Sequence, residues 1–204
     1  VASDIPALLK YTRRYSVLEE GDMAVCTAQG IRFYNEFGEA VEREKLTADW
    51  DMEAAEKGGY PHFMLKEIYE QPKTINDTIS PRIKDNDIVI EELNMSDEEI
   101  KEITKIHIVA CGSAYHTGVT AKYVIEGLAR IPVEVDLASE FRYRRPILDK
   151  NALAIIVSQS GETVDSLAAL REAKEHGVRT LGIVNVVGSS IAREADNVFY
   201  TLAG

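Results

Sequence analysis

The sequence predicts an α/β protein whose main domain is a five-stranded parallel sheet of the doubly wound type, with helices on both faces. From residue 105 onwards, short apolar runs rich in Val and Ile alternate with stretches that carry apolar residues at helical spacing. Apolar strands that alternate with amphipathic helices are typical of βαβ units, which build a parallel sheet covered on both sides. The turn-rich first part of the chain predicts a short antiparallel β meander before this domain.

The elements of the main domain follow one another without long gaps. The expected strands are residues 105–111, 133–138, 151–160, 178–186 and 197–202. The expected helices are residues 163–177 and 189–196, and one that starts after a loop within 112–131. Gly177 closes the first of these, as glycine commonly does at the end of a helix.

The first 46 residues read as a β meander. Short alternating runs are separated by turn signals at Gly21-Asp22, Gln29-Gly30 and Phe37-Gly38. So small a meander has little core of its own, and Cys26 is expected inside it. We expect residues 1–46 to be the last strands of a larger domain.

A polar stretch and a helix connect the meander to the main domain. Residues 47–60 end in Gly58-Gly59 and are predicted to be a linker. Residues 61–79 have helical spacing, and Pro72 should kink or restart the helix there. The predicted domains are therefore 1–46, the linker 47–60, and 61–204.

The composition excludes several classes of partner. The 204 residues carry a net charge of −11, which argues against nucleic acid and against an anionic membrane, because both attract basic surfaces. The two cysteines, Cys26 and Cys111, have no metal-like spacing, and a cytoplasmic location is expected because disulfides are not indicated. No apolar run is long enough to span a membrane.

Two segments that follow strands share one composition. These are "CGSAYHTG" (111–118) after the first strand and "SQSGETVD" (158–165) after the third. Each offers small residues, hydroxyls and the start of a helix, where unpaired N–H groups attract an anion. The second segment does not have the pattern of a P-loop, a dinucleotide fingerprint or a nucleophile elbow. An oxyanion site is one interpretation; in the other, Ser160 or Thr163 only caps the helix and Glu162 complements its dipole.

The same stretches resemble the sugar isomerase (SIS) domain family, whose fold is flavodoxin-like. The resemblance rests on "ACGSAYHTG", "ASEFRYR", "SQSGETVDSLAALREAKEHG" and "NVVGSSIAREAD". It extends to "RRYSVLEEGDMA" and "GGYPHFMLKEIYEQP", which are similar to the end of the glutaminase domain and the interdomain connection of the glutamine–fructose-6-phosphate aminotransferases. The main domain is most similar to the first of the two SIS domains in that family.

This resemblance implies a binding role. Ser113, Ser158, Gln159, Ser160 and Thr163 would hold the phosphate of a hexose phosphate, fructose 6-phosphate or glucosamine 6-phosphate. No cofactor and no metal are implied. Where the family often has a second hydroxyl in the first loop, this chain has Ala114, which can offer only its backbone N–H.

The resemblance also implies what the chain does not carry. The family's glutaminase nucleophile is an N-terminal cysteine, whereas residue 1 is Val, and the family's sugar-isomerising groups belong to its second SIS domain and C-terminal tail. We therefore expect an internal fragment with no catalytic residues, which binds the sugar phosphate, does not turn over alone and associates as a homodimer. A regulatory SIS sensor and a structural dimerisation module are the alternatives.

Four further features have expected roles. His107 should be a hydrogen-bonded structural histidine, and Cys111 a small packed residue. His116, early in the helix after the first loop, should pack rather than touch the ligand. The basic cluster "FRYRRP" (141–146) should form a subunit contact, with Glu140 as its nearest countercharge.

Overall fold

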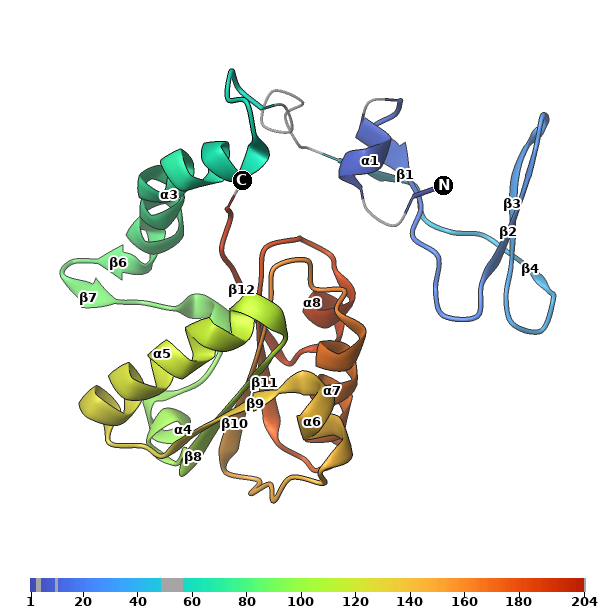
Figure 1. Cartoon of the computed structure of the whole chain (residues 1–204). Coiled ribbons are helices and arrows are strands. Elements are labelled where there is room, and N and C mark those ends of the chain that lie inside the picture. Colours follow the sequence, from blue (N-terminus) through green and yellow to red (C-terminus); the bar gives the residue numbers. More distant parts are fainter. Residues whose placement is uncertain (3–4, 10, 49–56, 204) are drawn as a thin grey trace. The chain divides into compact units, whose positions relative to one another are not determined.

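The computed structural model describes residues 1–2, 5–9, 11–48 and 57–203 (Figure 1). The chain forms two compact units, residues 1–69 and residues 70–203. Most of the predicted linker, residues 49–56, lies outside the described residues.

The second unit is built on the predicted five-stranded sheet, which is confirmed. Every pair of neighbouring strands is parallel, and the strand order is β12-β11-β10-β8-β9. The strands are β8 (Lys105–Ala110), β9 (Val133–Leu137), β10 (Ala152–Ser158), β11 (Arg179–Val184) and β12 (Asn197–Tyr200). The first crossover therefore runs from β8 to β9 on one side, and the chain then returns to place β10 on the other side of β8.

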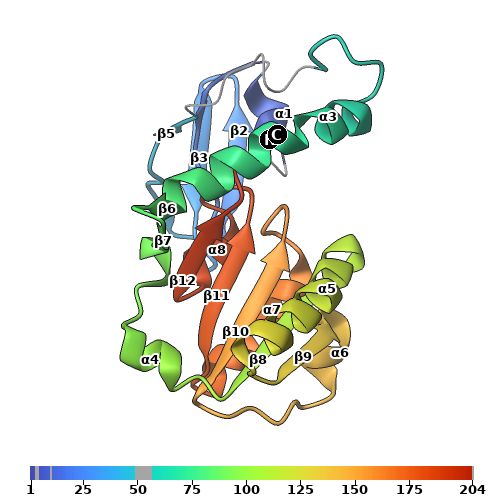
Figure 2. The same ribbon diagram turned by 90° about the vertical axis from the view of Figure 1, so that its left-hand side faces the viewer.

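Helices cover both faces of this sheet. One face carries α5 (Gly112–Ala129), and the opposite face carries α6 (Ala138–Tyr143), α7 (Val164–Glu175) and α8 (Ser190–Glu194), as Figure 2 shows. Buried side chains on the α7 face include Val109, Ile156 and Leu170, all fully buried. On the α5 face, Gly118 allows close packing, because a Cβ there would lie 2.9 Å from Ile108 Cγ2.

Two features of this unit differ from the prediction. Helix α5 starts at once at Gly112, so the expected loop after β8 does not exist; Gly112 makes the turn with φ of +56°. Helix α6 was not predicted. The Arg144 side chain at its end bonds Asp136 and Glu134 of β9, with Nη2 at 2.7 Å from Asp136 Oδ2. The expectation that Glu140 is the nearest countercharge of the basic cluster is wrong for this arginine.

A helix and short irregular elements precede β8. Helix α3 (Phe63–Ile79) continues through Pro72, so the predicted restart is wrong. It is followed by the 3₁₀ helix η1 (Ser80–Arg82), the β6–β7 hairpin (Ile83–Lys84, Asp87–Ile88), the 3₁₀ helix η2 (Glu91–Leu93) and α4 (Asp97–Lys101). Arg82 secures this segment, because its guanidinium bonds Glu92 at 2.5 Å and lies 3.8 Å from the centre of the Phe199 ring on β12.

The first unit contains the predicted meander. Strands β2 (Met23–Thr27), β3 (Gly30–Tyr34) and β4 (Ala40–Val41) form an antiparallel sheet, and β1 (Arg14–Tyr15) pairs with β5 (Leu46–Thr47). A short helix, α1 (Pro6–Leu9), precedes them. Cys26 is exposed, so its predicted place in a core is wrong. A three-stranded sheet buries few side chains, and Met23, Val25 and Ile31 are exposed as well.

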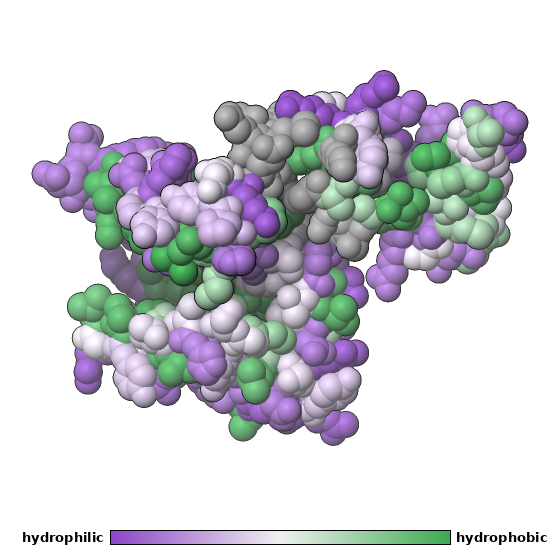
Figure 3. Space-filling view, turned by 45° about the horizontal axis from the view of Figure 1, so that its top comes forward, coloured by the Kyte–Doolittle hydropathy of each residue, from purple (hydrophilic) through white to green (hydrophobic). Residues whose placement is uncertain are grey.

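Apolar side chains are common on the surface of the described residues. Figure 3 shows apolar patches among polar residues on the face that it views. On α5 the exposed examples are Tyr123, Val124 and Leu128. No helix among the described residues is long and apolar enough to cross a bilayer.

One ion pair ties the meander together. Arg43 Nε lies 2.7 Å from Asp22 Oδ2 and Arg43 Nη2 lies 2.8 Å from Asp22 Oδ1, and the Asp22 side chain is 2% exposed. The hydrogen bonds from Arg43 and from the Glu19 N–H lower the pKa of Asp22 to about 2. The carboxylate therefore stabilises the folded meander wherever it is ionised.

The Asp22 pair predicts an acid-sensitive first unit. In the unfolded chain Asp22 titrates at about 4, so its contribution is complete above that pH and is lost as the pH falls from about 4 towards 2. NMR titration of the Asp22 carboxyl carbon should give a midpoint near 2. A midpoint near 4 would contradict the pairing, and the Asp22→Asn variant should lose this part of the acid dependence.

Candidate functional site

The candidate site lies where the strand order of the sheet reverses, between β8 and β10. β8 and β10 are parallel neighbours, with Ala110 opposite Val157, so the segments that follow them leave the sheet at the same edge. Because β8 leads to β9 on one side and β10 lies on the other, α5 and α7 diverge onto opposite faces. In open α/β sheets, such a switch point is where ligands bind.

The loop after β10 (residues 158–163, the hydroxyl loop) is organised by its own side chains. Ser158 Oγ lies 3.0 Å from Thr163 Oγ1 and accepts a hydrogen bond from Gly161 N–H at 3.1 Å. Ser160 Oγ accepts a hydrogen bond from Glu162 N–H at 3.2 Å. Three predicted site residues thus have hydroxyls that are hydrogen-bonded within one short loop. Ser158 is 4% exposed, whereas Ser160 and Thr163 are half-buried.

Neither Ser160 nor Thr163 caps α7 in the described part of the chain, so the helix cap expected in the second interpretation is wrong. Thr163 is the N-cap residue of α7, but its side chain accepts no bond from the helix, because Thr163 Oγ1 pairs with Ser158. Ser160 accepts from Glu162 N–H, which lies before the helix. The carboxylate of Glu162 bonds the backbone of Ser190 instead of the first turn of α7. The first N–H groups of α7 are therefore left uncapped by side chains, as an anion requires.

The first turn of α5 supplies the other side of the site. Cys111 is the N-cap residue and makes no side-chain cap, so the start of this helix is uncapped too. Ser166 Oγ on α7 bonds Cys111 Sγ at 3.8 Å, which links the two helix starts directly. Ser113 is exposed in the first turn of α5, where a loop was expected. Cys111 packs against the buried cluster as predicted.

Gln159 contributes differently from the hydroxyl residues. Its side chain is exposed, and its backbone carbonyl accepts a hydrogen bond from Asn185 N–H at 3.0 Å. Asn185 belongs to residues 185–191, which were predicted to contain the end of a strand and the start of a helix but no ligand-binding residue. This segment is bonded to the hydroxyl loop. Polar and small residues also follow β11, and this pattern could have indicated a third segment beside the site. Residues 185–191 were not selected because their sequence matches no ligand-binding motif.

The histidines lie outside this arrangement. His107 is fully buried, as expected for a structural residue, and burial is the main cause that lowers its pKa. The predicted hydrogen bond is wrong: among the described residues neither ring nitrogen has a partner, and the nearest carboxylate oxygen, Glu134 Oε2, is 3.9 Å from Nδ1. His116 is exposed on α5.

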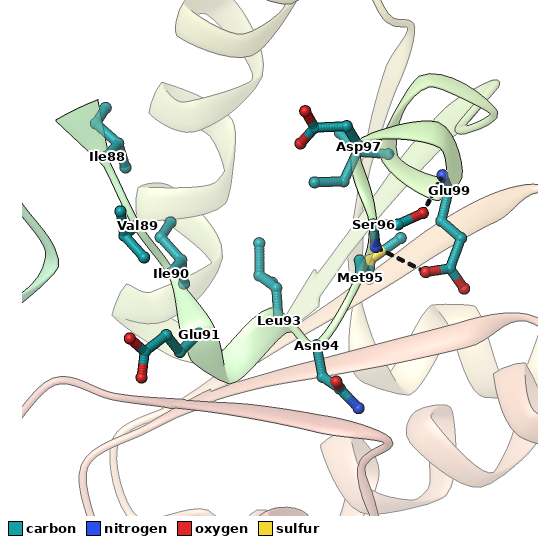
Figure 4. Close-up of a pocket in the computed structure, with 11 residues that line it drawn as sticks. Ile88, Val89, Ile90, Glu91, Leu93, Asn94, Met95, Ser96, Asp97 and Glu99 are labelled. Atoms are coloured by element: carbon teal, nitrogen blue, oxygen red, sulfur yellow. Dashed lines mark hydrogen bonds between the residues drawn. The ribbon is translucent and has the colours of Figure 1, made fainter.

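A separate hollow lies between the β7 strand and α4 (Figure 4). Its lining comes from one continuous stretch, residues 88–100, and mixes apolar side chains with polar and acidic ones. Glu99 at its rim accepts a hydrogen bond from Ser96 N–H at 2.8 Å and so caps α4. None of the predicted site residues lines this hollow.

The order and direction of the five strands, with helices on both faces, define a doubly wound α/β fold. The model of the SIS domain matches residues 99–204, just over half of the chain, and the chain belongs to this family.

Curated relatives are similar to the chain over its whole length. The glutamine–fructose-6-phosphate aminotransferase (isomerizing) of Clostridium acetobutylicum is 57% identical over 205 aligned residues, which cover 100% of this chain and 34% of that protein. The chain thus spans about a third of the length of the curated relatives it matches.

Solved structures show the same fold. The C-terminal domain of glucosamine-fructose-6-phosphate aminotransferase from Francisella tularensis is similar with a TM-score of 0.67 and 44% identity, over 73% of this chain and 42% of that one. The sugar isomerase domain of an RpiR transcription factor from Sphaerobacter thermophilus has a TM-score of 0.52 at 23% identity, over 67% of this chain and 74% of that one. The second likeness shows the fold alone.

The hydroxyl loop predicts a strict requirement for glycine at position 161. Gly161 has φ of +67°, and a Cβ there would lie 2.0 Å from Ser189 Oγ. We expect Gly161→Ala to lower the free energy of unfolding by more than about 2 kcal/mol, from backbone strain plus the clash. Denaturant titration followed by circular dichroism measures it.

Gly177 offers a matched control, since it has φ of +71° and open space around its Cβ position. Gly177→Ala should show the strain alone, about 1–2 kcal/mol. Equal losses in the two variants would mean that Ser189 does not press on the loop.

Proposed function

We propose that the hydroxyl loop and the first turn of α5 bind the phosphate group of a hexose phosphate, and that the chain is part of a glutamine–fructose-6-phosphate aminotransferase. The observation that carries the proposal is the gathering of Ser158, Ser160 and Thr163 beside the uncapped start of α7, at the switch point of the sheet. Ser113 and Gln159 complete the proposed set from the neighbouring helix turn and from the exposed side of the loop.

The chemistry of these groups suits a phosphate monoester. The hydroxyl pair of Ser158 and Thr163 can exchange its mutual bond for bonds to phosphate oxygens by rotation alone. The uncapped N–H groups of α7 add donors and partial positive charge. No lysine or arginine is needed, because several hydrogen bonds to one anion share its charge.

In the proposed reaction, glutamine and fructose 6-phosphate give glucosamine 6-phosphate and glutamate. Holding the phosphate anchors the sugar at a distance from its reacting carbonyl, so that binding energy fixes the position of the reactive end. The residues of this chain are assigned to binding only. The acid and base groups of the reaction are assigned to parts of the relatives that this chain does not span.

The relatives favour the aminotransferase over a stand-alone regulatory sensor. A phosphosugar-binding regulatory module would need only the SIS domain, whereas the aminotransferase relatives align with 100% of this chain, residues 1–98 included. In this proposal residues 1–46 end a glutaminase-like domain, 47–60 connect, and 61–204 form the sugar-phosphate domain.

Two further assignments accompany the proposal. A homodimer is supported by the apolar side chains exposed on α5, which a second copy could cover. A cytoplasmic location is supported by Cys26 and Cys111, which are both free thiols.

The proposal predicts selective stabilisation by phosphosugars. Fructose 6-phosphate and glucosamine 6-phosphate should raise the unfolding temperature of the chain. At a hundredfold excess over Kd, the free energy of unfolding should increase by about 2.7 kcal/mol. Fructose without phosphate should have no effect. A calorimetric thermal scan measures this, and identical curves with and without phosphosugar would refute the binding site.

Variants test which hydroxyls take part. Thr163→Val keeps the shape of the side chain and removes its hydroxyl, and should weaken binding about tenfold; Thr163→Ser should retain it. Ser160→Ala should act like Thr163→Val. Thr120→Ala is the control, since Thr120 is exposed farther along α5 and its hydroxyl donates to His116 O at 3.2 Å. A control that weakens binding as much would count against the assignment.

A further inference from the structure

We infer that Glu162 is a positioning residue of the proposed phosphate site, because its carboxylate holds the hydroxyl loop on the first amide of α8. The inference rests on the proposed function and deepens it. Glu162 Oε1 accepts a hydrogen bond from Ser190 N–H at 2.7 Å. A carboxylate that was free to approach the ligand would repel a phosphate dianion. The bond to Ser190 N–H instead gives the Glu162 carboxylate a structural partner.

The bond from Glu162 belongs to a clamp between two loops. Asn185 N–H donates to Gln159 O at 3.0 Å, and Ile191 N–H donates to Gly161 O at 3.0 Å. In the part of the chain that the structure describes, these two and the Glu162 bond are the hydrogen bonds that join the hydroxyl loop to residues 185–191. Only the Glu162 bond uses a side chain of the loop, so only this one can be removed by substitution without altering the backbone.

The clamp is close-packed at its centre. Ser189 is 3% exposed, and its Oγ has no hydrogen-bond partner among the described residues. It lies where a side chain on residue 161 would be, so glycine is what allows the two segments to approach. The hydroxyl loop therefore rests against residues 185–191 instead of being free at the edge of the sheet.

Glu162 also fixes the position of the Ser160 hydroxyl, one of the groups proposed to bind the phosphate. Its own N–H donates to Ser160 Oγ at 3.2 Å, while its carboxylate is held by Ser190. One residue thus connects the orientation of Ser160 to the start of α8. The next residue is Thr163, whose hydroxyl is paired with Ser158, so a shift of Glu162 would disturb both ends of the hydroxyl set.

The test measures the Kd of the 204-residue chain for fructose 6-phosphate by titration calorimetry, at a temperature where every variant is folded. Glu162→Ala should weaken binding about tenfold, the effect of losing one hydrogen bond to a charged group. Glu162→Gln should stay within about threefold of the parent chain, because its amide oxygen can accept the same bond. Tighter binding by both variants would show that the carboxylate acts only by repulsion and would overturn the inference.

The donor side gives an independent arm. Ser190→Pro removes the N–H that Glu162 accepts, and proline is tolerated at the first position of a helix. The preceding residue, Ser189, has φ of −63° and ψ of 163°, which suits a residue before proline. Ser190→Pro should weaken binding as Glu162→Ala does, and the double variant should be no weaker than either. Ser190→Ala, which keeps the N–H, should bind like the parent chain; additive losses would overturn the inference.

A stability control separates positioning from general weakening. Glu99 also accepts a backbone N–H, that of Ser96 at 2.8 Å, but at the start of α4. Glu99→Ala should lower the unfolding temperature and leave Kd unchanged, and an equal loss of affinity would overturn the positioning role. If the parent chain binds phosphosugar and Glu162→Ala binds equally well, this inference alone fails. If the parent chain binds no phosphosugar, the proposed function fails with it.

Discussion

The parallel pairing of β8 with β10 is the constraint on which the rest of the second unit depends. With Ala110 opposite Val157, both strands end at the same level, and the polar residues that follow them must share one edge. The reversal of strand order at this pair sends α5 and α7 to opposite faces of the sheet. A different register would shift the start of α5 relative to the hydroxyl loop without altering the local structure of either.

The proposed anion site lies on an acidic chain, so binding there must rely on short-range contacts. The net charge of −11 repels a phosphate dianion at long range, and salt would weaken that repulsion. Attraction has to come from donors within hydrogen-bond distance, and the hydroxyl loop with the start of α7 supplies them at the end of a buried strand. Such a site favours shape and donor geometry over charge alone.

Much of this arrangement could be predicted from the sequence. The five strands, their parallel order and the two polar segments follow from local pattern, because apolar runs and turn residues are read one segment at a time. The capping box of Ser96 and Glu99 is equally local, because its two partners are three residues apart. The start of α5 at Gly112 was missed because glycine there acts through its positive φ, which a loop would use as well.

What could not be predicted depends on contacts between distant residues. The Glu162–Ser190 bond joins positions 28 apart, and the ion pairs that place α6 depend on the arrival of β9 beside β8. Burial also misled: Cys26 alternates like a core residue, yet its sheet is too small to enclose it. His107 is buried as expected, but which partners its ring meets is decided by neighbouring elements.

Asn185 has a consequence that reaches beyond the loop it supports. Its backbone N–H holds Gln159, while its side-chain oxygen accepts bonds from Thr201 Oγ1 at 2.9 Å and Ala203 N–H at 2.6 Å. If a ligand at the proposed site stabilises the Asn185–Gln159 bond, it also favours the bonds from Thr201 and Ala203 to the Asn185 side chain. By reciprocity, ordering of residues 201–203 favours ligand binding by the same free energy. Residues 201–203 and the proposed site are thereby connected through one residue, Asn185.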